Sequence, residues 1–349
     1  MDDTRTDPPT KRVPPIRRRS LGAASFDWVS ITPHHDDAEY PTRLEPKLEG
    51  IRLHEWAHAH RQRIQQLLTE KRALLFRGFD LGGAAGFGNV VDALSNGPRL
   101  PYRDRSTPRI AHGDNIYCTT MYPPDQTIRL HNEGSYWSAW PLKAFFGCVT
   151  APPVGGETPI GDVHRVHERI DPDVRREFDA RRWMLVRNYH DGFALPWQDV
   201  FQTSSRSEVE QYCGEHGIEL EWLGPDRLRT RQVRAAIQTH PWSGEPLWFN
   251  HAAFFHVQSR EPALRDALLR EFGVDELPYQ TFFGDGVTIP DDVVRHINDA
   301  YEAERTMFRW QPGDLHLIDN MRLAHARQPY QGDRLILVAL TEAYATPSS

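Results

Sequence analysis

The stretch RLHNEGSYW (129–137) contains two side chains that can bind a metal ion, His131 and Glu133. They are separated by one residue, so on an extended backbone both side chains leave the same face of a strand. An imidazole and a carboxylate placed in this way can occupy neighbouring corners of one metal, as in a 2-His-1-carboxylate triad. Such a pair is common by itself, and the plain alternative is a half-buried polar end of a strand.

A third metal ligand has to come from a partner strand, and the C-terminal stretch 310–340 contains two histidines that could supply it. His316 lies in the middle of the predicted strand DLHLIDN (314–320), between two leucines, and is typical of an ordinary strand residue. His325 follows that strand and precedes a turn, PYQGD, that leads into another strand. We therefore expect His325 to lie opposite His131 at the mouth of a sheet.

The segment LHEWAH (53–58) raises a competing metal hypothesis, because it matches the H-E-x-x-H pattern of zinc peptidases. On a helical wheel, however, His54 and His58 fall on the shoulder of the apolar face and point toward solvent. One continuation of the pattern would need glycine and histidine where the chain has Arg61 and Ile64. A zinc metallopeptidase acting through His54, Glu55 and His58 remains an alternative that the sequence does not favour.

The composition excludes several classes of protein. The chain has 349 residues, 39% of them hydrophobic and 26% charged, which suits a globular enzyme with a sizeable core. Its net charge of -7 predicts no binding to nucleic acid or to a membrane surface. Three unpatterned cysteines favour a reducing cytoplasm over a disulfide framework.

Strand patterns dominate the second half of the chain, and helices are interspersed without strict alternation. This organisation predicts a mainly β fold with helical decoration, a sandwich or barrel. We expect one domain over residues 21–349, preceded by a Pro-rich, charged and disordered tail over residues 1–20. The predicted strands are 72–79, 142–151, 182–189, 218–223, 235–240, 246–251, 314–320 and 334–342, and the predicted helices are 51–71, 87–95, 163–180, 205–216, 262–272 and 290–307.

Residues 97–127 are rich in Pro, Asp, Arg and Thr and predict a long irregular excursion. Long excursions inside compact enzymes are commonly functional. We also expect Asp162 and Ser205 to cap helices, and HPWSGEP (240–246) to form the turn of a hairpin.

Many stretches, in order along about 270 residues, resemble the TauD/TfdA-like family of Fe(II)/2-oxoglutarate-dependent dioxygenases. The resemblance is strongest to the SyrP-like, clavaminate-synthase-like branch. It implies a double-stranded β-helix core of the jelly-roll or cupin type, flanked by helices. The matching stretches are FRGF (76–79), LHNEGSYWSAWP (130–141), GGETPIGD (155–162), RNYHDGF (187–193), WQDVF (197–201), HPWSGEPLWFN (240–250), FGDG (283–286) and WQPGDLHLIDNMRLAHARQPYQGDR (310–334).

The resemblance implies that His131, Glu133 and His325 are the iron ligands. It also implies that Thr158 contacts the carboxylate of 2-oxoglutarate, whose far carboxylate meets an arginine. In many members that arginine lies further along the last strand, near the position of Val338 here. The basic candidates in this chain are Arg334, which we favour, and Arg327.

The implied reaction uses Fe(II), O₂ and 2-oxoglutarate as cosubstrate, which becomes succinate and CO₂. Because the related halogenases lack the carboxylate that Glu133 supplies, we expect hydroxylation of an aliphatic C–H bond, with desaturation, epoxidation or ring formation as alternatives. The expected substrate is an amino acid or a metabolite derived from one, free or bound to a carrier protein, in secondary metabolism such as antibiotic biosynthesis.

Contacts to that small-molecule substrate are expected from polar residues within or beside the matching stretches and the long excursion. A homo-oligomer is compatible with the sequence. A metal-free, cupin-like binding module is the alternative from another class of protein, and only the displaced arginine favours it. The candidate substrate-binding residues are Asn115, Tyr136, Arg187, Asn250 and His251.

Overall fold

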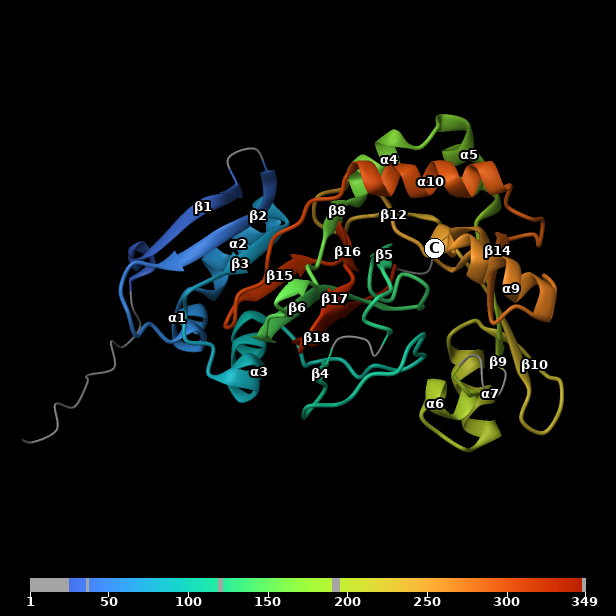
Figure 1. The fold of residues 1–349 in the computed structure, drawn as a ribbon, viewed down its shortest axis with the longest axis horizontal. Helices are drawn as coiled ribbons and strands as arrows, with labels where there is room; N and C mark the ends of the chain where they lie inside the picture. The colour runs from blue at the N-terminus through green and yellow to red at the C-terminus, as the bar shows by residue number, and fades with distance from the viewer. Residues whose placement is uncertain (1–24, 36–37, 119–121, 190–194, 347–349) are drawn as a thin grey trace, which may run out of the picture.

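The computed structural model describes residues 25–35, 38–118, 122–189 and 195–346. Its centre is a seven-stranded sheet that faces a smaller sheet, and helices cover the outside (Figure 1). The predicted disordered tail, residues 1–20, lies outside the described residues. Among the described residues, no helix is both long and apolar enough to cross a membrane.

The large sheet has the strand order β1-β2-β3-β15-β6-β18-β4, and its pairs are antiparallel except for β2 with β3. Its central strands are buried on both faces, which explains their mostly apolar sequences. The bounds are β1 (Val29–His35), β2 (Ala38–Pro46), β3 (Ala73–Phe76), β15 (Leu315–Asp319), β6 (Trp140–Thr150), β18 (Leu335–Tyr344) and β4 (Tyr117–Cys118).

Alternate residues of these strands enter two different apolar clusters. Phe145 and Leu317 pack under the N-terminal helices, whereas Phe146 and Ile318 pack toward the smaller sheet. That sheet has the order β5-β16-β8 and consists of β5 (Ile128–His131), β16 (Leu323–Arg327) and β8 (Ile160–Asp162). Two sheets that share one core in this way form the double-stranded β-helix expected from the sequence, and a short pair, β7 (Val154–Gly155) with β17 (Tyr330–Gln331), extends its rim.

Two of the predicted helices are interrupted. Residues 51–71 form α1 (Leu53–Ala59) and α2 (Arg61–Lys71), which meet at His60 and bury their apolar side chains in one cluster. Residues 163–180 form α4 (Val163–Arg169) and α5 (Pro172–Arg181), because Pro172 cannot continue a helix but can begin one. The predicted helix at 87–95 begins earlier, as α3 (Gly83–Leu94).

A second layer of sheet and helices lies beyond the small sheet (Figure 1). Asp162 and Ser205 cap α4 and α7 (Arg206–Glu215) as predicted, and residues 240–245 join the hairpin strands β12 (Ile237–Thr239) and β13 (Pro246–Trp248). The four-stranded sheet has the order β10-β11-β9-β14. The bounds are β9 (Trp183–Tyr189), β10 (Glu219–Trp222), β11 (Leu228–Arg234), β14 (Tyr279–Phe283), β12 (Ile237–Thr239), β13 (Pro246–Trp248), α6 (Trp197–Phe201), α7 (Arg206–Glu215), α8 (Ala252–Phe255), α9 (Pro262–Phe272) and α10 (Asp291–Ala303), with 3-10 helices η1 (Phe26–Trp28) and η2 (Val257–Ser259).

Candidate iron centre

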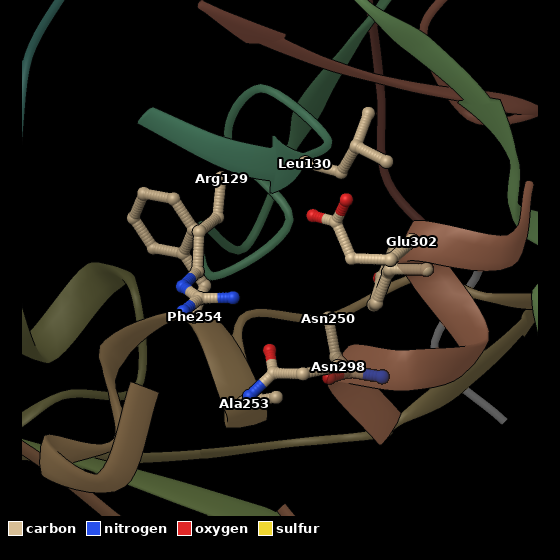
Figure 2. A pocket seen from close by; sticks show the side chains of 8 residues that line it. Arg129, Leu130, Asn250, Ala253, Phe254, Asn298 and Glu302 are labelled. Carbon is tan, nitrogen blue, oxygen red and sulfur yellow. The ribbon is translucent and has the colours of Figure 1, made fainter. Parts of the chain in front are cut away.

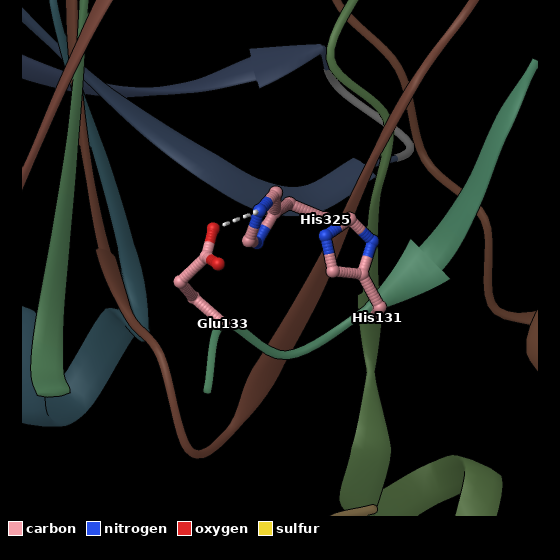
Figure 3. Close-up of side chains that lie close together, drawn as sticks. All are labelled: His131, Glu133 and His325. Carbon is pink, nitrogen blue, oxygen red and sulfur yellow. Dashed lines mark ion pairs between the residues drawn. The ribbon is translucent and has the colours of Figure 1, made fainter. Parts of the chain in front are cut away.

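The small sheet brings the two candidate histidine ligands together. His131 ends β5 and is the direct partner of His325 on the antiparallel strand β16, so their side chains leave neighbouring positions of one face. Glu133 follows in the turn after β5. Figure 3 shows the three side chains converging, with the Glu133 carboxylate beside the His325 ring.

The geometry of this group suits one metal ion. One ligand atom from each of His131, Glu133 and His325 lies within 4.8 Å of the other two. The Oε2 atom of Glu133 lies 3.7 Å from Nε2 of His325, and the two imidazole centroids are 4.5 Å apart. Among the described residues, these three side chains are the one set of His, Cys, Asp or Glu close enough together to hold a metal ion.

Contacts behind the ligands fix their orientation. Nδ1 of His131 lies 2.9 Å from the backbone oxygen of Arg129, and its N–H donates there, which leaves Nε2 as the metal-binding atom. The Asn320 side chain accepts from the backbone N–H of Glu133 at 2.9 Å and donates to the carbonyl oxygen of Glu133. Nδ1 of His325 is buried without a hydrogen-bond partner among the described residues, so this nitrogen is open to a further ligand. Two imidazoles and a carboxylate are the donor set that suits Fe(II).

Two of the candidate ligands, His131 and Glu133, are held in the protonation states that bind a metal. Burial lowers the pKa of His131 to about 3, and the neighbouring His325 adds to this effect, so the imidazole is neutral. Burial alone would raise the pKa of Glu133, but the Arg109 guanidinium first, and His325 second, hold it well below its usual value. A neutral imidazole and an ionised carboxylate need to lose no proton on metal binding.

Two residues that the sequence did not single out contact Glu133. The Tyr102 hydroxyl donates to Oε1, and Nη2 of Arg109 donates to Oε2 at 2.9 Å. Both residues come from the excursion 97–127, which was predicted to be irregular and functional. The length of this excursion was the one sequence feature that pointed to a functional role. No sequence motif or residue spacing singles out Tyr102 or Arg109 within it.

The other end of the same pocket carries the candidate cosubstrate residues. A hollow of about 390 Å³ is lined by the three ligands together with Thr158, Arg327 and Arg334. The Thr158 hydroxyl accepts from the Trp310 indole at 3.0 Å and from Nη2 of Arg334 at 3.5 Å. Burial, and then the nearby Arg327, lower the pKa of Arg334 to about 10. A bound anion next to Arg334 would therefore stabilise its charged form.

The two candidate arginines differ in their partners. The Arg327 guanidinium donates to the backbone oxygens of Tyr122, Pro123 and Gln126 at 2.8, 2.5 and 2.7 Å, and so holds the end of the excursion. Arg334 instead donates through Nε to the Gly156 oxygen at 3.0 Å, and its far nitrogen faces Thr158. Arg334 is thus the better placed of the two for a carboxylate.

Of the candidate substrate-binding residues, His251 packs against the ring of His131. Its ring centroid is 5.6 Å from that of His131, and the Ser135 hydroxyl contacts its Nδ1 at 2.5 Å. Tyr136 is buried in the core, with its hydroxyl donating to the Asp104 oxygen at 2.8 Å.

The remaining candidates have partners elsewhere. Arg187 forms a buried ion pair with Asp104 at 2.5 Å, and Asn115 donates to the Arg99 oxygen at 3.0 Å. Asn250 donates to the Ala236 oxygen at 2.8 Å and lines a different hollow, of about 350 Å³. Figure 2 shows this second hollow with Arg129 and Glu302 on either side.

The competing zinc hypothesis finds no support in the geometry. His54 is about one third exposed and faces Glu55, and His58 is exposed on the seven-residue helix α1. In the part of the chain that the structure describes, neither histidine belongs to a group of ligands close enough to share an ion.

Comparison with known proteins agrees with this site. Residues 36–341 match the model of the taurine catabolism dioxygenase TauD, TfdA family. The dapdiamide synthesis protein DdaC of Enterobacter agglomerans is 40% identical over 279 residues, which is 80% of this chain and 84% of that protein. A clavaminate synthase-like protein of Arabidopsis thaliana is 28% identical over 327 residues, covering 88% of this chain and 95% of the relative.

Solved structures share the fold at low sequence identity. PvcB of Pseudomonas aeruginosa superposes with a TM-score of 0.54 at 17% identity, over 94% of this chain and 98% of PvcB. AAD-2, solved with Mn(II) and N-oxalylglycine, gives a TM-score of 0.53 at 12% identity, over 92% of this chain and 99% of that one. With a family match over most of its length and a relative at 40% identity, the chain belongs to the TauD/TfdA family of Fe(II)- and 2-oxoglutarate-dependent dioxygenases.

Proposed function

We propose that the enzyme hydroxylates an aliphatic C–H bond of an amino acid, or of a metabolite derived from one, in secondary metabolism. The observation that carries the proposal is one pocket with two ends. His131, Glu133 and His325 converge at one end, and Thr158 and Arg334 lie at the other. The name of DdaC, a dapdiamide synthesis protein, supports a biosynthetic role.

Each end of the pocket has its own task. His131, Glu133 and His325 hold Fe(II), which activates O₂ to oxidise a C–H bond while 2-oxoglutarate becomes succinate and CO₂. Arg334 holds the far carboxylate of 2-oxoglutarate, because its planar guanidinium fits a planar anion, and the Thr158 hydroxyl donates to the same group. Arg327 supports this end indirectly, through the backbone oxygens that it contacts.

The reaction is hydroxylation rather than halogenation because Glu133 keeps its carboxylate. His251 is the first candidate for a direct contact with the substrate, whereas Tyr136 and Arg187 act through Asp104. The same residues are compatible with desaturation, epoxidation or ring formation. The substrate is free or is presented on a carrier protein.

An anaerobic titration tests the cofactor assignment. Apo protein mixed with Fe(II) and 2-oxoglutarate should develop the visible charge-transfer band of the chelated complex. Arg334→Ala should weaken 2-oxoglutarate binding strongly, whereas the control Arg309→Ala, at an exposed arginine that contacts the Pro153 oxygen, should not. A folded wild-type protein without the band would overturn the dioxygenase assignment and favour a metal-free binding module. Unchanged 2-oxoglutarate affinity in Arg334→Ala would reject only the assignment of Arg334 to the carboxylate of 2-oxoglutarate.

Succinate formation tests the substrate class. The loaded enzyme should form succinate faster with particular amino acids or their derivatives than without an added substrate. Each compound should be offered both free and as a thioester on a carrier protein. Stimulation by the carrier-bound form alone would settle the mode of presentation, and stimulation only by compounds without an amino-acid skeleton would contradict the proposal.

A further inference from the structure

Both oxygens of the Glu133 carboxylate have a hydrogen-bond donor besides the other metal ligands. Tyr102 donates to Oε1 and Arg109 donates to Oε2, and Arg109 also donates to the Tyr102 hydroxyl oxygen at 2.9 Å. The three side chains therefore form a closed triangle of hydrogen bonds. We call Tyr102 and Arg109 the carboxylate clamp.

The clamp is buried and packed. The side chains of Arg109 and Glu133 are 6% and 4% exposed, and the Arg109 guanidinium stacks 4.1 Å from the centroid of the Tyr102 ring. The Tyr102 ring in turn packs edge-on against Trp137, with the centroids 5.5 Å apart. Charge-assisted bonds in a water-poor site hold a carboxylate more firmly than exposed ones. An ionised carboxylate has about four acceptor positions, so positions remain for a metal after both clamp bonds are made.

The segment between the two clamp residues is itself anchored. Asp104 forms a buried ion pair with Arg187 of β9, and Arg187 also donates to the Arg105 oxygen at 2.6 Å. The Tyr136 hydroxyl donates to the Asp104 oxygen at 2.8 Å, and the Tyr279 hydroxyl of β14 donates to the Ser106 oxygen at 3.1 Å. The four-stranded sheet thus holds an otherwise irregular segment at the metal site.

We propose that Tyr102 and Arg109 are positioning residues that hold the Glu133 carboxylate in its iron-binding orientation, and that the Asp104–Arg187 ion pair holds them there. The inference rests on the proposed function, since it assigns Glu133 to iron. The clamp restricts rotation of the carboxylate before the ion arrives, so that less conformational entropy is lost on binding.

Anaerobic calorimetric titration of the apo protein with Fe(II) tests the clamp. Tyr102→Phe removes one hydroxyl and keeps the packed ring, and Arg109→Met removes the charge at similar length. Hydrogen-bond partners of a metal ligand typically contribute about 10–100-fold to metal affinity. We therefore expect the Fe(II) affinity to fall about 10-fold in Tyr102→Phe and about 100-fold in Arg109→Met. Arg109→Lys, which restores the charge without the planar fork, should fall between Arg109→Met and the wild type.

The matched controls are Arg99→Met, which breaks the Arg99–Asp92 ion pair of the same excursion, and Tyr189→Phe, which removes a buried hydroxyl bonded to Thr230. Both should bind Fe(II) as the wild type does. A purely structural role would lower the affinity for 2-oxoglutarate at saturating Fe(II) together with the affinity for Fe(II). In Tyr102→Phe we expect the Fe(II) affinity to fall and the 2-oxoglutarate affinity at saturating Fe(II) to stay unchanged.

The outcomes separate this inference from the proposed function. Absence of Fe(II) binding or of the charge-transfer band in wild-type protein overturns the function itself. A normal band in wild-type protein, with Fe(II) affinity unchanged in Tyr102→Phe, overturns only the clamp. An equal loss of affinity in the controls also rejects it. If Arg109→Met does not fold, Tyr102→Phe decides the question alone.

Discussion

The two sides of the candidate iron centre are built on different kinds of backbone. His131 and His325 are partners on paired strands, where hydrogen-bonded register fixes the distance between side chains. Tyr102 and Arg109, which hold Glu133 from the other side, belong to an irregular segment without such a register. Their placement depends on side-chain contacts, above all those of Asp104 and Arg187. We call the paired strands that carry His131 and His325 the strand side, and the segment that carries Tyr102 and Arg109 the loop side. The strand side is expected to keep its geometry when a side-chain contact is lost, whereas the loop side is expected to lose it.

The largest expected effect comes from removing the carboxylate that joins the two sides. Glu133→Ala should abolish Fe(II) binding and should also destabilise the apo protein, because Arg109 is left as a buried cation without its partner. Breaking a buried ion pair in this way typically costs about 3–5 kcal/mol. Urea denaturation of the apo protein and Fe(II) calorimetry measure the two effects.

The matched control for this change is His325→Ala on the strand side. It should also abolish Fe(II) binding, but it leaves Arg109 paired with Glu133 and so should destabilise the apo protein less. Equal destabilisation by the two substitutions would contradict the distinction between the strand side and the loop side.

A smaller effect is expected from Asp104→Asn, which weakens the anchor of the loop side without touching a ligand. Asparagine keeps an oxygen acceptor for Arg187, so the cost should lie near the lower end of the range for a broken buried pair, about 3 kcal/mol. Fe(II) affinity should fall as well, since Tyr102 and Arg109 flank Asp104. Hydrogen exchange should rise over the described residues 102–109 and stay unchanged in β5 and β16. Exchange that rises equally in the strands would show that the two sides are not held independently.

The same contrast explains what could be predicted from the sequence. The H-x-E spacing and a histidine beyond a C-terminal strand predicted three candidate ligands whose side chains do come together, because strand periodicity places alternate residues on one face. The break at His60 was missed because the apolar pattern continues through it, whereas Pro172 marks the second break in the sequence and the prediction passed over it. The contacts of Tyr102 and Arg109 could not be predicted, because no periodicity relates a loop residue to a partner 31 or 24 residues away.

The candidate substrate residues illustrate the same limit. Arg187 was singled out as a polar residue beside a recognisable stretch, and it lies on β9 as the pattern indicated. Its partner Asp104 comes from the excursion, so the sequence could place the strand but could not assign the side chain to loop anchoring. Arg334 and Arg327 could likewise be distinguished only once the partners of each guanidinium were known.

The smallest predicted effect concerns the cosubstrate end, where Trp310 donates its indole N–H to the Thr158 hydroxyl oxygen at 3.0 Å. Because that oxygen also faces Nη2 of Arg334, its own hydrogen is directed to another acceptor, which we assign to the carboxylate of 2-oxoglutarate. Trp310→Phe should cost about 0.5–1.5 kcal/mol of stability and weaken 2-oxoglutarate binding slightly, leaving Fe(II) affinity unchanged. Thr158→Val should weaken 2-oxoglutarate binding more than Trp310→Phe, since it removes the donor itself. The reverse order, measured by titrating the charge-transfer band, would show that Trp310 acts by packing rather than by orienting the hydroxyl.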